Sequence, residues 1–456
     1  MELDKYQQQC LDKLIWSTKQ LDVKIEHTEL AKIAEIIVET MTGPWRYFHT
    51  PAHIFEVGGE ENAIEVLAAL FHDLVYVQVD HSINLNLTYY IAPYIKERRS
   101  ELFIREKAEL PNDVMFEIVI TIFGFIPGQL LSPLLGQNEF LSALAAAKIL
   151  EPFFTKTILA QIVVCIEATI PFRDKINGLT SSEVLQQRLE ETNIKFNLGF
   201  TASEIEETIH KSVKMSNRDV GGFALENSAH FLDNTWSLLP ETNHHLHHSN
   251  SYTIQQYRIA LTKMEGFLNF LTPELIFRKF KGEPDVATYQ SMLARGQKNL
   301  AVGRLYLKCK IVAIALLEAL SWRFGKNVPL AAMMGELPSL DFSLSRLVDF
   351  LPPTPPEYYP PKNPLEEEVL HLLEVGRTQN FTYDLKESPL ATLIVKTLGF
   401  DKVEQLRQQA NDFFEGKLSG EELLKLYNHD LLGTITTAIA QLMDQRKQAL
   451  CKYNCK

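Results

Sequence analysis

The chain has 456 residues, 46 % of them hydrophobic, and a formal net charge of −12 at pH 7. This length and this hydrophobic fraction can fill the core of one large domain or of two to three ordinary ones. The pI is near 5.6 and lysine and arginine form no cluster, which argues against a broad nucleic-acid-binding surface, because phosphate contacts need clustered positive charge.

The cysteines and the apolar segments indicate a cellular location. The five cysteines are scattered without a Cys-x-x-Cys pair, as is typical of a reducing compartment. The first residues, MELDKYQQQC, are acidic where a signal peptide has a basic region. The apolar runs 158–170 and 311–322 are too short to span a membrane and contain Gln or Glu. We therefore expect a cytoplasmic protein without membrane contact.

Helical periodicity dominates the chain. In 28–41 the apolar residues Leu30, Ile33, Ile37 and Met41 recur at three- and four-residue steps, which places them on one side of a helix. Strand-like alternation is scarce, so we expect an all-α fold. The same spacing predicts further helices over 61–77, 138–150, 201–215 and 299–324.

A proline-rich segment divides the C-terminal half. Residues 352–364, PPTPPEYYPPKNP, hold seven prolines, which lack the amide hydrogen that a helix needs, and predict a stiff connector. We expect an N-terminal body over 1–285 and a helical accessory region over 286–456. The C-terminal helices are a candidate surface for a homo-oligomer.

Two short stretches carry the candidate chemistry. In RYFHTPAHIFEV (46–57), Thr50 suits an N-cap and Pro51 the first helical position, which predicts His53 in the first turn and His49 just before it. In LAALFHDLVY (67–76), His72 and Asp73 lie at the end of an apolar helical stripe, where an unpaired carboxylate is costly. A divalent cation would offset that cost, and a buried His-Asp hydrogen bond without metal is the alternative.

Four elements in this order resemble the HD-domain metal-dependent phosphohydrolases over about residues 40–235. They are Tyr-x-His-x-x-x-His, Leu-Ala-Ala-Leu-Phe-His-Asp, Asn138-Glu139-x-x-Ser142-Ala143, and a later Asp in VKMSNRDVGGF. The chain is similar to the cyclic-nucleotide phosphodiesterases and to predicted bacterial HD phosphohydrolases. By this resemblance the metal ligands would be His53, His72, Asp73 and Asp219.

The resemblance also implies roles for neighbouring residues. His49 would protonate the leaving group of the substrate, and the ion would be Mn, Fe, Zn, Ni or Mg. Further residues are candidates for ligand orientation or for the substrate pocket, with a purely structural role as the alternative: Glu56, Tyr76, Glu139, Ser142 and Arg173. Arg173 cannot bind a metal ion but could hold a phosphate.

The chain departs from this family in two places within the core motifs of 46–235. About sixty residues (77–137) are inserted where the bacterial family has a short link, and IPFRDK follows 166–169 where that family tends to have a histidine. We therefore expect one ion rather than two. Asp219 could instead pair with Arg218 or cap a turn, with Asp174 as the fallback ligand.

Other histidines and aspartates are predicted to be structural. NHHLHHSN (243–250) reads as a surface loop, Asp80-His81 as the start of a loop, and Asp430 in 428–430 as a helix cap. The chain has no P-loop, G-x-G-x-x-G or G-x-S-x-G motif. We expect a hydrolase of a nucleotide or another small phosphate ester; the alternatives are an inactive HD-fold protein that binds a nucleotide or metal and regulates, and an HD-type metal oxygenase.

Overall fold

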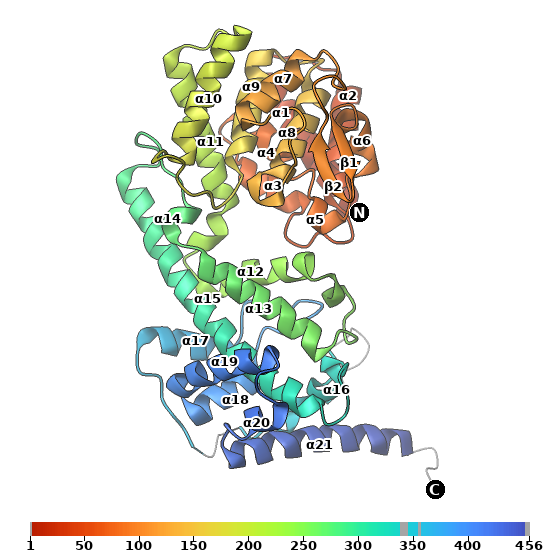
Figure 1. The fold of residues 1–456 in the computed structure, drawn as a ribbon, viewed down its shortest axis with the longest axis vertical. Helices are drawn as coiled ribbons and strands as arrows, with labels where there is room; N and C mark the ends of the chain where they lie inside the picture. Colours follow the sequence, from red (N-terminus) through yellow and green to blue (C-terminus); the bar gives the residue numbers. More distant parts are fainter. Residues whose placement is uncertain (1, 338–344, 354–356, 452–456) are drawn as a thin grey trace. The chain divides into compact units, whose positions relative to one another are not determined.

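The computed structural model describes residues 2–337, 345–353 and 357–451. Within these ranges twenty-one α-helices accompany one two-stranded antiparallel sheet, and Figure 1 shows how far helices dominate. The predicted all-α class is confirmed. No helix in the described ranges has both the length and the apolar character that crossing a membrane requires.

The chain forms two compact units. Unit 1 comprises Met1–Ala224 and Thr272–Arg295, and unit 2 comprises Leu225–Leu271 and Gly296–Lys456. This division differs from the single boundary expected near residue 285. Two asparagines near the boundaries each bond to a distant segment of their own unit. Asn217 bonds the amide and the carbonyl of Arg278 in unit 1, whereas Asn299 bonds Ser228 and the Leu225 carbonyl in unit 2.

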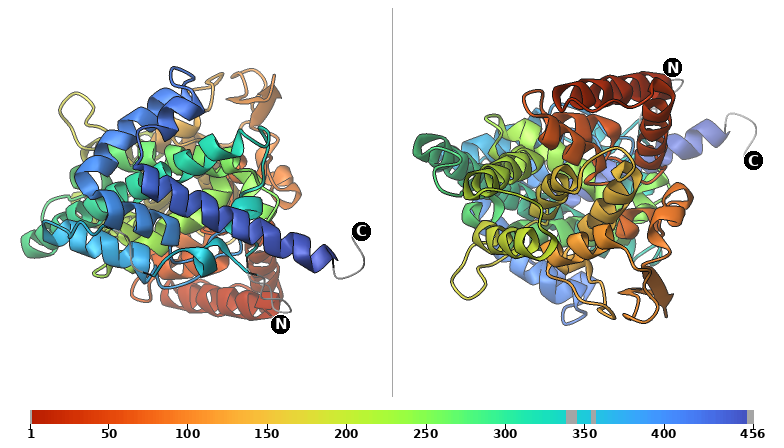
Figure 2. Two further views of the ribbon diagram at one scale, coloured as in Figure 1. Left: turned by 90° about the horizontal axis from the view of Figure 1, so that it is seen from below. Right: turned by 90° about the horizontal axis from the view of Figure 1, so that it is seen from above.

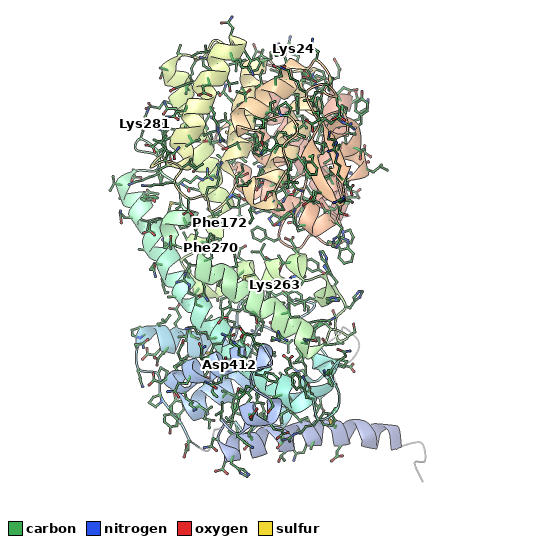
Figure 3. The ribbon with its side chains drawn as sticks, viewed as in Figure 1. Lys24, Phe172, Lys263, Phe270, Lys281 and Asp412 are labelled. Atoms are coloured by element: carbon green, nitrogen blue, oxygen red, sulfur yellow. The ribbon has the colours of Figure 1, made fainter. Side chains whose placement is uncertain are left out.

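Unit 1 is a helical bundle with a short hairpin. The hairpin pairs β1 (Ile95–Arg98) with β2 (Glu101–Ile104), with Ile95 opposite Ile104, and it lies at the edge of unit 1 in Figure 1 and in the right-hand view of Figure 2. Charged side chains such as Lys24 and Lys281 are exposed on this unit (Figure 3). Its helices are α1 (Glu2–Gln20), α2 (His27–Met41), α3 (Pro51–Gly58), α4 (Ala63–Phe71), α5 (Val77–Asp80), α6 (Leu85–Ile91), α7 (Val114–Phe123), α8 (Gln137–Leu150), α9 (Lys156–Ala168), α10 (Ser181–Phe196), α11 (Ala202–Asp219), α14 (Pro273–Ile276) and the start of α15 (Val286–Ser321), with the 3-10 turns Pro133–Leu135 and Gly221–Ala224.

The core of unit 1 is built around α4, α8 and α9. All nine residues of α4 are buried, because α1, α3, α9 and α11 pack around it. A helix that is apolar on nearly all sides is stable only in such a surrounded position. The three helices therefore form the centre of unit 1. His72 and Asp73 directly follow the end of α4.

The helices predicted over 28–41 and 138–150 agree with α2 and α8, whereas the helix predicted over 201–215 continues to Asp219 and the one predicted over 299–324 already begins at Val286. The helix expected over 61–77 ends at Phe71, and His72–Leu74 form a turn. The inserted segment 77–137 is structured, since it holds α5, α6, the hairpin and α7.

Unit 2 is helical throughout its described parts. The proline-rich connector has no helix over 352–353 and 357–363, α17 begins at Pro364, and residues 354–356 of the connector lie outside the described residues. A buried ion pair between Arg407 and Glu265 (Nε to Oε1, 2.9 Å) joins α13 to α19. The helices of unit 2 are α12 (Ser228–Thr242), α13 (Ile254–Phe270), the rest of α15, α16 (Leu330–Met334), α17 (Pro364–Glu374), α18 (Pro389–Leu398), α19 (Phe400–Phe414), α20 (Gly420–Leu424) and α21 (His429–Cys451), with the 3-10 turns His244–His247 and Leu347–Phe350.

Two predictions about structural residues have different outcomes. The histidine-rich segment 243–250 is a 3-10 turn with flanking loops, and it buries Leu246. The prediction that Asp430 caps the last helix is wrong. Asn428 is the cap, because its Oδ1 accepts the amides of Asp430 (2.8 Å) and Leu431 (3.4 Å), and Asp430 already lies inside α21.

The cap assignment can be tested by stability. We expect Asn428→Ala to lower the free energy of unfolding by about 1 kcal/mol, because two helix amides lose their acceptor. The matched control Asp430→Ala should lower it by less than about 0.5 kcal/mol, the contribution of a charge near a helix start. Urea unfolding followed by circular dichroism measures both, and equal losses would contradict the assignment.

Candidate metal centre

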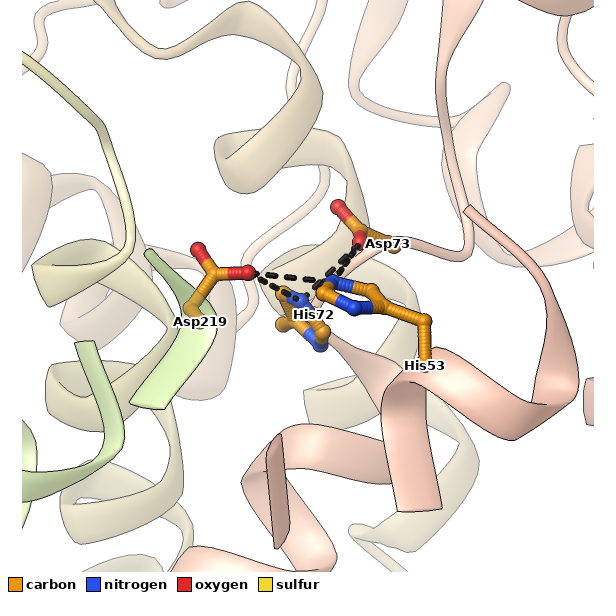
Figure 4. A group of neighbouring side chains, drawn as sticks. All are labelled: His53, His72, Asp73 and Asp219. Carbon is orange, nitrogen blue, oxygen red and sulfur yellow. Dashed lines mark hydrogen bonds and ion pairs between the residues drawn. The ribbon is translucent and has the colours of Figure 1, made fainter. Parts of the chain in front are cut away.

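Four side chains from three segments of unit 1 converge at one place. His53 lies in the first turn of α3, His72 and Asp73 in the turn after α4, and Asp219 at the end of α11 (Figure 4). Each offers one ligand atom, and these four atoms lie within 4.8 Å of one another. The four residues are the set that the resemblance implied, separated by up to 166 positions in the chain.

The distances suit four ligands around a single ion. His53 Nε2 lies 3.1 Å from Asp219 Oδ1 and 3.6 Å from Asp73 Oδ2. His72 Nε2 lies 2.9 Å from Asp73 Oδ2 and 3.4 Å from Asp219 Oδ1. Ligand atoms bonded at about 2.1 Å to one ion stand roughly 3.0 to 3.4 Å apart in octahedral or tetrahedral geometry.

The hydrogen bonds of His72 prepare its Nε2 for a cation. The Nδ1 of His72 lies 2.8 Å from the carbonyl oxygen of Ala69, to which only a protonated nitrogen can donate. In the neutral ring Nε2 then carries the lone pair. Although His72 Nε2 and Asp73 Oδ2 are close, neither has a partner in hydrogen-bond geometry. Two buried, unsatisfied atoms that face the same space fit a metal ion, and the two-nitrogen, two-oxygen donor set suits Mn, Fe, Zn or Ni.

Electrostatics favours a positive charge at this place. The side chains of Asp73 and Asp219 are each 17 % exposed. Burial alone would lower the pKa of His72, but the two carboxylates outweigh it and raise that pKa well above its usual value. Burial likewise opposes ionisation of Asp73 and Asp219, and the facing histidines hold the pKa of both carboxyl groups below the usual range. Without a cation, the proton on His72 supplies part of the compensating charge, and an ion would displace it.

The turn that carries His72 and Asp73 is held by α8. Ser142 Oγ accepts the amide of Val75 (3.0 Å), and Asn138 Oδ1 accepts the amide of Val77 (3.1 Å). Asn138 and Ser142 are four residues apart and therefore lie on the same side of α8. The Asn-Glu-x-x-Ser pattern thus has a physical role, which is to fix the chain just after the His-Asp pair. Ser142 acts on the backbone here rather than on a pocket.

Arg46 holds the same turn from the other side. Its side chain is fully buried and donates to the carbonyls of Asp73 (2.6 Å) and Leu74 (3.2 Å). Asp80 accepts from Arg46 through both carboxylate oxygens, at 2.6 and 3.2 Å. Asp80 ends the short helix α5 rather than beginning a loop, and His81 follows in the left-handed region with φ 61°.

Arg218 positions the end of α11. It donates to the Val57 carbonyl (2.7 Å) at the end of α3 and pairs with Glu65 of α4 (2.5 Å). These contacts overturn the alternative in which Arg218 takes the carboxylate of Asp219. They also tie together the three segments that supply ligands. Gly59, at φ 62°, ends α3 beside Arg218, in a conformation that favours glycine.

His49 lies beside the four candidate ligands but is not one of them. Its ring centroid is 5.8 Å from that of His53 and 4.5 Å from that of Tyr76, which packs edge-on against it. The helix begins at Pro51 as predicted, although the Thr50 side chain makes no capping hydrogen bond. His49 is half-exposed and its charge acts on Asp73, so it is placed to reach a molecule bound at the centre.

Glu139 extends from α8 toward the centre. Its Oε2 is buried without a hydrogen-bond partner. Burial, together with the charges of Asp73 and Asp219, raises the pKa of Glu139 to about 7. A carboxyl group kept neutral beside two ionised ones avoids a third like charge.

A group of arginines lies near Glu139. Arg173 forms a bidentate pair with the buried Glu167 (2.6 and 3.0 Å), and Arg188 reaches the same carboxylate at 3.2 Å. Arg278 acts on this group from the segment after α14. Burial and the charge of Arg173 lower the pKa of Arg278 to about 9, so it stays charged at neutral pH. Arg173 Nε and Arg278 Nη1 are buried without partners, so two donors remain for an anion.

Glu56 does not belong to the centre. It is exposed on α3 and lines a surface groove with Lys5 and Lys13 of α1. Asp174, the fallback ligand, is exposed as well. Glu56 lies three positions after His53, so the two side chains leave α3 in partly different directions. Glu56 is on the side of α3 that faces α1.

Sequence reasoning missed Arg46 and Arg278, and it considered Arg218 only as a partner of Asp219. Arg46 and Arg218 directly precede motif residues, so a search for buried cations beside the motifs could have found them. Arg278 had no local signal, because only folding brings it to α11 through Asn217. Comparison of the chain with protein-family models, with curated proteins and with solved structures finds no match.

The pKa of Glu139 predicts a pH dependence of stability in the metal-free protein. Since the folded state binds this proton more tightly than the unfolded state, its stabilising effect is complete below pH about 4.5 and is lost as the pH rises to about 7. The free energy of unfolding relative to Glu139→Gln should fall across this window, by about 3 kcal/mol at most. Chemical unfolding of both proteins in chelator measures it, and a pH-independent difference would contradict it.

Proposed function

We propose that this protein is a metal-dependent phosphohydrolase that acts on a small phosphate ester or nucleotide. The observation that carries the proposal is the convergence of His53, His72, Asp73 and Asp219, with unsatisfied buried atoms turned to a common space. A divalent cation held there would polarise a phosphoryl oxygen and make a bound water nucleophilic near neutral pH. The two carboxylates would offset both of its charges.

The arginines support an anionic substrate. Three guanidinium groups surround the single carboxylate of Glu167, and Glu139 has a pKa near neutrality, so positive charge is in excess. Two of these arginines keep an unpartnered buried donor, as described above. Arg173 and Arg278 would bind and orient the phosphate oxygens, and Arg donors match phosphate geometry well.

His49 would give a proton to the leaving oxygen. It lies next to His53 without being a ligand, and the edge of Tyr76 fixes its ring. An imidazole titrates close to neutral pH, so it can hold a proton and release it within one cycle. The site thus has separate groups for binding the anion and for protonating the leaving group.

Metal content tests the centre directly. We expect tag-free protein to contain about one equivalent of a transition metal, and His72→Ala/Asp73→Ala to contain almost none, because two of four ligands are removed. Elemental analysis measures this, with circular dichroism to show that the variant is folded.

Two controls separate this centre from other histidines. His230→Ala alters an exposed histidine of unit 2, and His245→Gln/His248→Gln removes exposed members of the 243–250 segment. Both should keep the metal. If the double variant of the centre keeps it too, or if reconstituted wild-type protein holds none, the proposed function is wrong.

Leaving-group dependence tests His49. With an alkyl or nucleoside phosphate we expect His49→Gln to lower kcat by roughly 100-fold or more, because the departing alkoxide needs a proton. With p-nitrophenyl phosphate the loss should be below about tenfold, since nitrophenolate leaves without protonation. Metal content should stay unchanged. Equal losses on both substrates would assign His49 to another role.

A further inference from the structure

Unit 2 contains a cavity far from any motif in the sequence. Its volume is about 90 Å³. On the same scale one water molecule needs about 10 to 15 Å³, so the cavity has room for a molecule of roughly six to nine heavy atoms. Most of its wall is apolar and comes from α15, α16 and α18. The residues include Ala313, Ile314, Leu317, Leu330, Met334 and Leu390.

Tyr257 lines this cavity and carries a buried, unsatisfied hydroxyl. The residue is 2 % exposed and lines the wall, and its Oη has no hydrogen-bond partner. Burial, with the nearby charge of Asp384, raises the pKa of Tyr257 well above its usual range, so the hydroxyl keeps its proton. A buried donor without an acceptor is uncommon and costs stability unless a ligand supplies one.

The start of α18 adds donors at the same wall. Ser388 is the N-cap, but its side chain makes no capping bond and instead contacts Lys310 Nζ and Tyr306 Oη, both at 3.3 Å. Leu390 and Ala391, the next residues of this ten-residue helix, line the cavity. The amides of a first helical turn lack partners within the helix and attract negative charge.

Lys310 contributes a nearly buried positive charge. Its Nζ contacts Asp384 Oδ2 at 3.0 Å, and a third proton remains after the bond to Ser388. Asp384 would not repel an anion strongly, because the same oxygen also accepts from Trp236 Nε1 (2.7 Å) and Arg377 (3.3 Å). Lys310 and Arg377 thus both act on the charge of Asp384, and Arg377 is shared with Asp233 (Nε to Oδ1, 3.4 Å).

We propose that this cavity binds a small carboxylic acid with an apolar body, the carboxylate facing Tyr257, Lys310 and the start of α18. Tyr257, Lys310 and the first residues of α18 line the cavity together with the apolar wall from α15 and α16. This site is independent of the metal centre in unit 1.

Binding of hexanoate to the full-length protein tests the proposal, measured by calorimetry and by the shift in melting temperature. Hexanoate should bind at least about tenfold more tightly than hexan-1-ol, which lacks the charge. Benzoate tests an aryl body of similar size. Ala313→Leu, which fills the cavity, should abolish binding of the acid. Failure of both acids to bind at millimolar concentration would overturn the proposal, and so would equal affinity for hexan-1-ol.

A matched pair of tyrosine variants locates the ligand. Tyr257→Phe should weaken binding of the acid about tenfold without lowering the melting temperature of the free protein, because the deleted hydroxyl has no partner. Tyr427→Phe deletes a buried hydroxyl of unit 2 that donates to the Val312 carbonyl (3.0 Å) away from the cavity. That control should melt lower but bind normally. Unchanged affinity in Tyr257→Phe would also overturn the proposal.

Discussion

The central constraint in unit 1 is the negative charge of two carboxylates, Asp73 and Asp219, which, in the described parts of the chain, face histidines and not a lysine or arginine. Asp73 and Asp219 are mostly buried and face the same two imidazoles. Two nearby carboxylates in a region of low dielectric repel each other, and each would lose its charge if left alone. The proton on His72 compensates for part of this charge in the free protein, and a divalent cation would do so better, since it would contact all four atoms at once.

The groups around the centre keep the four atoms in place. The turn with His72 and Asp73 is bonded through its amides by Ser142 and Asn138 and through its carbonyls by Arg46. Arg218 joins the ends of α3 and α11 to α4. Such supporting hydrogen bonds restrict a site more than the ligands themselves can, because each ligand is free to rotate about its side-chain bonds. Substitution of these residues should therefore disturb the centre without touching an ion or a substrate.

The two units place polar groups in different ways. In unit 1 five residues at or near the candidate metal centre have unpartnered buried polar atoms (His72, Asp73, Glu139, Arg173 and Arg278), whereas in unit 2 the unpartnered Tyr257 hydroxyl belongs to a residue that lines an apolar cavity. Unsatisfied buried groups are costly, so the several at the candidate metal centre and the Tyr257 hydroxyl at the cavity both favour binding of a ligand. A ligand-binding unit on the same chain would also suit the regulatory alternative considered from the sequence, in which the protein binds a nucleotide or metal with little or no turnover.

The amino-acid sequence by itself determined the helical class and the start of α3 at Pro51, because helix periodicity and the preference of proline for the first helical position are local properties of the chain, while the candidate residues of the centre came from the family resemblance that the motifs carry. It misjudged the end of α4, where the pattern continues through Val77 but bonds from Ser142 and Arg46 bend the chain after Phe71. Asp430 was mistaken for a cap because Asn428 stands only two positions away. Only the tertiary structure decided that Arg278 lies near Arg173 and that residues 225–271 belong with the C-terminal helices, since both depend on contacts between segments far apart in the chain, whose pairing no local pattern encodes.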